Sequence, residues 1–188
     1  IVFSSNRDGN FEIYAMNTDG TEITNLTNNP ASDQQPAWSP DGASILFTSD
    51  RGGFPNIYAM SNARNNIRLT QDANIELNPT WSPDGKKLIF TGQRNNEWNI
   101  VSIDITTKKE TNLTEDATLD DGAEYSPDGK YIYFNSVRTG TMKLWRMKPD
   151  GSEEEQVTFD EYNDWFPHFS PDGKWILYVA FPKDIDPT

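Results

Sequence analysis

Short apolar segments separated by polar turns form the basic pattern of this chain. Runs of three apolar residues recur at 45–47, 88–90, 132–134 and 176–178. A second apolar pair recurs as Ile13-Tyr14, Ile57-Tyr58, Ile100-Val101 and Leu144-Trp145. Runs this short and rich in β-branched and aromatic residues predict strands, and no helical period accompanies them.

A turn motif, Ser-Pro-Asp-Gly, precedes each of the apolar runs. It stands at 39–42, 82–85, 126–129 and 170–173, with steps of 43, 44 and 44 residues. Pro and Asp favour a tight turn, and Gly accepts a positive φ at little cost. Twelve residues before each motif stands a threonine: Thr27, Thr70, Thr114 and Thr158. The Asn-Leu-Thr tripeptides at 25–27 and 112–114 repeat with this period, so we interpret them as structural.

Each repeat therefore predicts four short strands in about 43 residues, which is the period of a β-propeller blade. We predict an all-β, single propeller domain over residues 1–188, with a partial blade at 1–27, full blades at 28–70, 71–114 and 115–158, and a partial blade at 159–188. Four-stranded antiparallel blades, about four and a half of them, would leave open strand edges. A six-bladed ring containing them is therefore favoured, and a compact four-bladed ring is the alternative. The aromatic residues before each Ser-Pro are expected to pack between neighbouring sheets: Trp38, Trp81, Tyr125 and Phe169.

Composition removes several classes of function. The formal net charge of −13 argues against nucleic acid and anionic membrane surfaces, because both attract Lys and Arg. The chain has no Cys, which excludes disulfides and thiolate metal sites. No apolar run approaches the roughly 20 residues of a membrane span, and the first residues do not form a signal peptide.

One end of the predicted sheets gathers charged residues. We call it the connection rim, because it holds the fourth-to-first strand connections and the second-to-third strand hairpins; the Ser-Pro-Asp-Gly turns form the opposite turn rim. Six residues after each recurrent threonine stands an acid: Asp33, Glu76, Asp120 and Asp164. An arginine recurs on the same rim: Arg7, Arg51, Arg94 and Arg138. We expect carboxylate–guanidinium braces that tie one blade to the next. The alternative is an acidic collar that attracts a cation or a basic peptide.

A second column, ten residues after each threonine, reads Ala37, Thr80, Glu124 and His168. We expect Glu124 and His168, the only histidine, to lie side by side at the channel mouth as the core of a ligand site. The neighbouring candidates are Asp120, Asp121, Asp164 and Trp165. The alternative is a structural role for a lone histidine. No nucleophile or metal-binding motif is present, so we assign no catalytic residue, metal or cofactor.

The stretches 47–60 and 78–87 resemble the propeller repeats of the TolB family of bacterial proteins, and the resemblance covers essentially the whole chain. It implies a β-propeller and export from the cytoplasm. TolB itself is periplasmic and takes part in an envelope-spanning complex with a peptidoglycan-associated lipoprotein, so the resemblance implies a similar role. Similar blades occur in uncharacterised secreted relatives and in propellers attached to prolyl-oligopeptidase-like enzymes.

We therefore expect a non-enzymatic scaffold of the bacterial cell envelope that binds a protein or peptide partner on the acidic rim. Nucleic acid binding and membrane insertion are not expected, and edge-to-edge pairing of two copies is a further mode of assembly. One alternative is the propeller of a hydrolase whose catalytic domain lies outside this chain. The other is a carbohydrate-binding or carbohydrate-acting propeller that uses Glu124, His168 and Trp165.

Overall fold

A computed structural model describes residues 1–61, 65–70, 74–115 and 119–183. These residues form strands and no helix, and no segment among them could cross a membrane as a helix. The strands are β1 (Val2–Ser5), β2 (Glu12–Ala15), β3 (Thr24–Asn25), β4 (Asp33–Trp38), β5 (Ser44–Ser49), β6 (Asn56–Ser61), β7 (Asn66–Arg68), β8 (Glu76–Trp81), β9 (Lys87–Arg94), β10 (Glu97–Asp104), β11 (Glu110–Asn112), β12 (Asp120–Tyr125), β13 (Ile132–Ser136), β14 (Lys143–Met147), β15 (Glu155–Gln156), β16 (Asn163–Phe169) and β17 (Ile176–Phe181).

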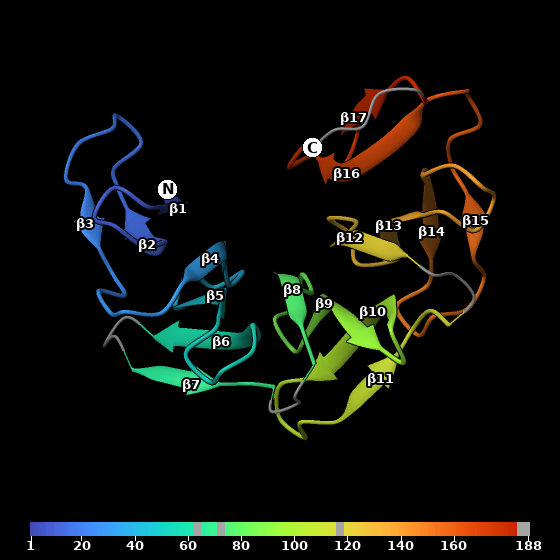
Figure 1. Ribbon diagram of the computed structural model, residues 1–188. Coiled ribbons are helices and arrows are strands. Elements are labelled where there is room, and N and C mark those ends of the chain that lie inside the picture. Colours follow the sequence, from blue (N-terminus) through green and yellow to red (C-terminus); the bar gives the residue numbers. More distant parts are fainter. Residues whose placement is uncertain (62–64, 71–73, 116–118, 184–188) are drawn as a thin grey trace. The chain divides into compact units, whose positions relative to one another are not determined.

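The chain divides into two compact units, residues 1–81 and 82–188, and each is described by itself. The first unit contains the sheet β1-β2-β3, the sheet β4-β5-β6-β7 and strand β8. The second contains β9, β10 and β11 side by side, the sheet β12-β13-β14-β15 and the pair β16-β17 (Figure 1). Each strand runs antiparallel to its sequence neighbour in these sheets. This confirms the predicted fold class of four-stranded antiparallel sheets.

The Ser-Pro-Asp-Gly motif forms the same closed turn in each repeat. In the third copy, the Ser126 hydroxyl donates to Asp128 Oδ1 at 2.7 Å, and the Lys130 N–H donates to the same oxygen at 3.1 Å. The Gly129 N–H donates to the Ser126 carbonyl at 2.8 Å, with φ of 70° at the glycine. The turn therefore satisfies its own polar groups and fixes the first hairpin of each sheet.

The recurrent threonine lies two residues after the end of the fourth strand and binds the third strand through its side chain, a contact that we call the threonine latch. The backbone N–H that opens the third-strand apolar pair donates to the threonine Oγ1 at 3.0–3.1 Å in four repeats: Ile13 to Thr27, Ile57 to Thr70, Ile100 to Thr114 and Leu144 to Thr158. Because the fourth strands are only two or three residues long, this side-chain acceptor extends a ladder that would otherwise stop. These threonines therefore have a structural role, since each satisfies a backbone N–H of the third strand.

The core lies between sheets that pack face to face. In the second unit, Ile89 and Ile100 contact a cluster that includes Tyr125, Ile132 and Phe134 of the next sheet. In the first unit, Ile13 of β2 joins a cluster with residues of β5 and β6. Neither sheet can bury its face alone, so adjacent repeats stabilise one another.

The aromatic residues before each Ser-Pro do not all occupy this interface. Tyr125 is 6% exposed, and Phe169 packs edge-on against Tyr133 of the preceding sheet, with ring centroids 4.9 Å apart. Trp38 is 42% exposed, so the prediction is wrong for this residue. Phe169, in contrast, lies against the Ser-Pro-Asp-Gly turn of the sheet before it.

Candidate functional site

A β-bulge divides the first strand of the repeats into two halves. The register shifts between Gln34 and Ala37 in β4, between Asp121 and Glu124 in β12, and between Trp165 and His168 in β16. The residues at these bulges, Gln35, Gly122 and Phe166, have a positive φ, and so does Asn78 at the equivalent position of β8. A bulge bends its strand and redirects the side chains that follow. The acidic column therefore lies before the bulge, and the column of Glu124 and His168 lies after it.

Side chains of a neighbouring strand hold the bulges in place. The Phe166 N–H donates to Asn135 Oδ1 at 2.8 Å, and the Asn78 N–H donates to Gln35 Oε1 at 3.0 Å. Asp121 Oδ1 accepts from the Gly122 N–H at 2.6 Å and from the Thr91 hydroxyl. Asp121, predicted as a ligand residue, thus binds the backbone of its own bulge.

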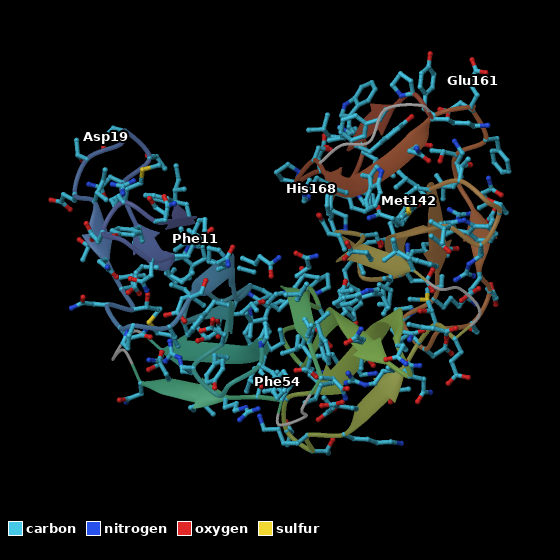
Figure 2. All side chains as sticks on the ribbon, viewed as in Figure 1. Phe11, Asp19, Phe54, Met142, Glu161 and His168 are labelled. Atoms are coloured by element: carbon cyan, nitrogen blue, oxygen red, sulfur yellow. The ribbon has the colours of Figure 1, made fainter. Side chains whose placement is uncertain are left out.

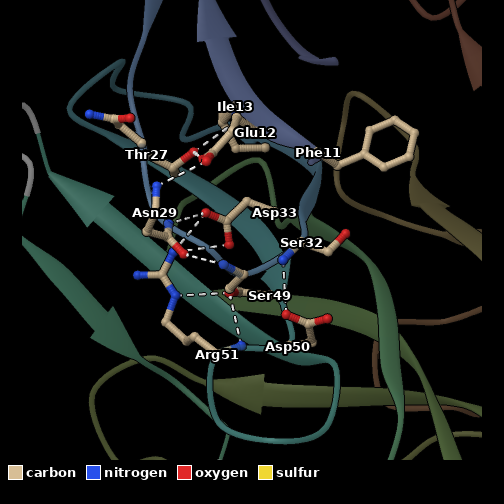
Figure 3. A network of polar contacts seen from close by, with 12 residues as sticks. Phe11, Glu12, Ile13, Thr27, Asn29, Ser32, Asp33, Ser49, Asp50 and Arg51 are labelled. Carbon is tan, nitrogen blue, oxygen red and sulfur yellow. Dashed lines mark hydrogen bonds and ion pairs between the residues drawn. The ribbon is translucent and has the colours of Figure 1, made fainter. Parts of the chain in front are cut away.

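The acidic column before the bulge is buried. All four of its carboxylates, Asp33, Glu76, Asp120 and Asp164, lie on residues that are 0% exposed. Arg51 Nη2 donates to both oxygens of Asp33 at 2.8 and 3.0 Å, and Asn29 Nδ2 donates at 2.7 Å (Figure 3). An exposed collar of these carboxylates is therefore excluded, and Asp120 and Asp164 cannot reach a ligand without rearrangement.

The arginine braces lie within one sheet. Asp33 starts β4, and its partner Arg51 lies in the β5–β6 hairpin of the same sheet. Asp120 starts β12, and its partner Arg138, 3.2 Å away, lies in the β13–β14 hairpin of the same sheet. The prediction that these pairs tie one blade to the next is therefore wrong. The hairpin arginine lies opposite the start of its own first strand because antiparallel strands bring those two points together.

The two other recurrent arginines have different surroundings. Arg7 is exposed and places its guanidinium over the Tyr14 ring at 4.7 Å. Arg94 pairs with Glu110 at 3.0 Å within its own sheet.

Residues of the third strand provide the links between sheets. Asn56 Nδ2 donates to Glu76 Oε2 at 3.3 Å. Lys143, which is 3% exposed, donates from Nζ to Asp164 Oδ2 at 3.2 Å and to Asp160 Oδ1 at 2.6 Å. Burial opposes the charge on Lys143, but the hydrogen bonds to Asp160 and Asp164 outweigh it and raise the pKa of this lysine. Glu76 and Asp164 are thus the acceptors that join one sheet to the preceding sheet.

After the bulge, the structure brings Glu124 and His168 together. His168 Nδ1 lies 2.7 Å from Glu124 Oε2, and the Phe169 N–H donates to Glu124 Oε1 at 3.2 Å. The His168 side chain is 68% exposed on β16 (Figure 2). An exposed imidazole with one nitrogen held by a carboxylate can accept or donate a hydrogen bond through the other.

This pair lies at the turn rim, away from the other predicted site residues. Glu124 stands opposite Tyr133, next to the Ser-Pro-Asp-Gly turn, whereas Asp120 begins the strand at the connection rim. Four residues of extended chain separate the two ends by roughly 13 Å. Trp165, before the bulge, is half-buried and lies against the Phe166 ring. The six predicted ligand residues therefore do not form one site.

The structure also exposes residues that the repeat pattern did not single out. Acidic side chains on the connection rim are Asp8, Asp50, Glu115, Asp160 and Glu161, and exposed aromatic ones are Phe11, Phe54, Phe159 and Tyr162. In the first unit a cavity of about 470 Å³ is lined there by Asn29, Pro30, Ala31, Asp50 and Arg51. No group of three potential metal-ligating side chains converges in the described ranges. These loop positions vary between repeats, and the periodic pattern carries no signal for them.

The family model of the TolB beta propeller domain matches residues 1–102 and 63–185. The chain belongs to this TolB β-propeller family. A TolB homolog of Chlorobaculum tepidum is 47% identical over 58 residues, which cover 31% of this chain and 13% of the homolog. The structure of a putative TolB from Agrobacterium tumefaciens aligns with a TM-score of 0.84 at 34% identity, covering 93% of this chain and 64% of that one. The structure of TolB from Acinetobacter baumannii aligns with a TM-score of 0.86 at 27% identity, covering 98% of this chain and 47% of that one.

The chain thus spans less than two thirds of the TolB chains that it matches. The TolB blades are shared over nearly the whole of its length. The predicted blade boundaries and the choice between six and four blades stay predictions.

Proposed function

We propose that this TolB-family chain is a non-enzymatic scaffold of the bacterial cell envelope that binds a protein or peptide partner at its connection rim. Family membership supports export and a scaffold role, because TolB relatives resemble it across the blades. The binding surface differs from the one expected from the sequence. The recurrent acids are buried braces, and the exposed residues around them would contact the partner.

One observation carries this proposal: exposed aromatic rings and carboxylates surround a rigid network at the connection rim of the first unit. Phe11 and Phe54 are 38% and 48% exposed. Asp50 Oδ1 accepts from the Ser32 N–H at 2.9 Å, and the Phe11 carbonyl accepts from the Asp33 N–H at 2.8 Å. These bonds fix the loops beside the cavity before any partner arrives (Figure 3).

Such a surface suits protein recognition. Aromatic residues contribute large contact areas at interfaces, and loops that are already ordered lose little conformational entropy on binding. Exposed Asp8 and Asp50 favour a partner with basic or amide-rich segments, since like charges at an interface are unfavourable.

The test is affinity capture from the envelope fraction of the source bacterium, comparing the wild-type chain with Phe54→Ser and Asp50→Lys. Glu22→Lys is the matched control, because Glu22 is exposed in the β2–β3 connection, at the opposite end of its sheet. We expect the rim variants to lose a specific partner that wild type and the control both retain. Equal recovery by all forms would refute binding at this rim, and a nucleophile-elbow motif encoded directly downstream would refute the non-enzymatic assignment.

A further inference from the structure

A second cavity lies at the turn rim of the second unit, between the sheet β12–β15 and the pair β16–β17. Its volume is about 470 Å³. Tyr131, Tyr133 and Arg146 form one wall, and Phe169 with Pro171 forms the facing wall. The cavity lies at the end of the sheets opposite the connection rim, so an inference about it does not depend on the proposed function.

The propeller repeat does not require these wall residues. The positions of Tyr131, Tyr133 and Arg146 are held by Ser44, Leu46 and Ala59 in the sheet β4–β7 and by Lys87, Ile89 and Ser102 in β9 and β10. The registers agree, because Tyr133 faces Arg146 as Leu46 faces Ala59 and Ile89 faces Ser102. The same backbone thus forms with small or aliphatic residues there. Tyr133 packs against Phe169 of the next sheet, whereas Tyr131 and Arg146 are not needed to form this backbone.

The wall is an ordered aromatic surface. The Arg146 guanidinium lies 4.6 Å from the centroid of the Tyr131 ring. Its Nη1 contacts Tyr133 Oη at 3.5 Å, so that oxygen acts as acceptor and leaves the hydroxyl proton for another partner. Phe169 packs edge-on against Tyr133, and Glu124 fixes the Phe169 backbone N–H at 3.2 Å.

The charges that border the cavity are paired with one another. Arg146 pairs with Glu155 at 2.6 Å. Asp128 pairs with Lys130 at 3.0 Å, and Asp172 pairs with Lys174 at 3.1 Å. Both aspartates also accept hydrogen bonds within their own turns. The cavity therefore matches a neutral ligand and offers no unpaired charge to an ionic one.

What remains available is aromatic and prolyl surface with tyrosine hydroxyl donors. A sugar presents several hydroxyl groups, each needing a polar partner, and the carboxylates that could serve them are already engaged. A polyproline II peptide presents ring faces and carbonyl acceptors and lacks N–H donors at proline, so it needs few polar partners. Aromatic-lined grooves recognise such peptides in other folds. We propose that the cavity between β13–β14 and β16 binds a proline-rich, uncharged peptide segment in the extended polyproline II conformation.

The test measures binding of a fluorescently labelled decaproline peptide to the whole chain, with a Gly-Ser peptide of equal length and a neutral hexasaccharide as rival probes. The variant Tyr131→Ser with Arg146→Ala carries the residues that the sheet β4–β7 has at these positions, so we expect it to fold. The matched control, Lys87→Ser with Ser102→Ala, makes the same replacements in β9 and β10. We expect saturable decaproline binding that weakens about tenfold in the variant and is unchanged in the control.

NMR chemical shifts of the wild-type protein locate the peptide without relying on the folding of any variant. Decaproline should move the amide signal of Gly173, which lines the cavity, and leave that of Gly85 in place. Tyr133→Phe, which keeps the ring, should weaken binding about two- to tenfold through loss of one hydroxyl donor. Absence of saturable decaproline binding, equal binding by the variant, or preference for the hexasaccharide would each overturn the proposal.

Discussion

The threonine latch makes a quantitative prediction, because the same bond occurs in buried and in partly exposed settings. Thr114 is 2% exposed, and its Oγ1 accepts from the buried Ile100 N–H at 3.0 Å. Thr158 makes the equivalent bond to the Leu144 N–H at 3.1 Å but is half-buried. Valine has nearly the same shape as threonine and cannot accept this bond, so Thr→Val isolates the acceptor.

In Thr114→Val, the Ile100 N–H is left buried without this acceptor, which costs about 1–3 kcal/mol. The additional methyl group offsets up to about 0.8 kcal/mol. We therefore expect the free energy of unfolding to fall by about 1–2 kcal/mol. At Thr158, water can reach the freed N–H, and we expect a loss of about 0.5 kcal/mol.

The measurement is urea-induced unfolding of the whole chain followed by tryptophan fluorescence, with unchanged m-values required before the variants are compared. Thr114→Ser keeps the hydroxyl acceptor and serves as the control for loss of the methyl group. The reasoning is refuted if Thr114→Val costs no more than Thr158→Val, or if Thr114→Ser destabilises as much as Thr114→Val.

Four further predictions concern three residues, Tyr125, Asp128 and Gly122. The buried Tyr125 hydroxyl has no hydrogen-bond partner among the described residues, so Tyr125→Phe should raise the free energy of unfolding by about 1 kcal/mol, and a loss in urea titration would contradict this. Burial also raises the Tyr125 pKa to about 12, so the tyrosine ionises more readily in the unfolded chain, and the free energy of unfolding should fall as pH rises from about 10 toward 12; absorbance titration at 295 nm should lose one late step in the phenylalanine variant. The Ser126 hydroxyl lowers the Asp128 pKa to about 2, so its stabilisation should be complete above about pH 4 and fade toward pH 2, and Asp128→Asn should flatten that part of the stability–pH curve. Gly122→Ala should lower the free energy of unfolding by about 1–3 kcal/mol more than Gly140→Ala does. Both glycines have a positive φ, but of the two only Gly122 has side chains within reach of an added Cβ, the nearest atom 2.7 Å away. Equal losses in urea titration would show that this contact is unimportant.

Some consequences of the sequence follow from local chemistry alone. The Ser-Pro-Asp-Gly turn forms as expected, because Pro, Asp and Gly set its dihedral angles and its hydrogen bonds involve residues close in sequence. The strands were also predictable from the sequence, since second strands such as β5 and β13 are buried along nearly their whole length and therefore require short continuous apolar runs. Placing Glu124 beside His168 also succeeded, because a repeat carries equivalent positions to equivalent places on neighbouring sheets.

The tertiary structure decided the rest. Whether an acidic column is exposed or buried depends on the third-strand residues of the preceding sheet, such as Lys143, which repeat alignment does not connect with Asp164. The bulge in β12 could not be predicted from the sequence, because Gly122 and Phe166 both have a positive φ at equivalent positions and no residue type marks the position. Asp120 and Glu124 lie on either side of this bulge, four residues apart on one strand, and that distance splits the predicted site. Contacts between sheets and local departures from strand register are properties of the packed chain, and a one-dimensional period does not encode them.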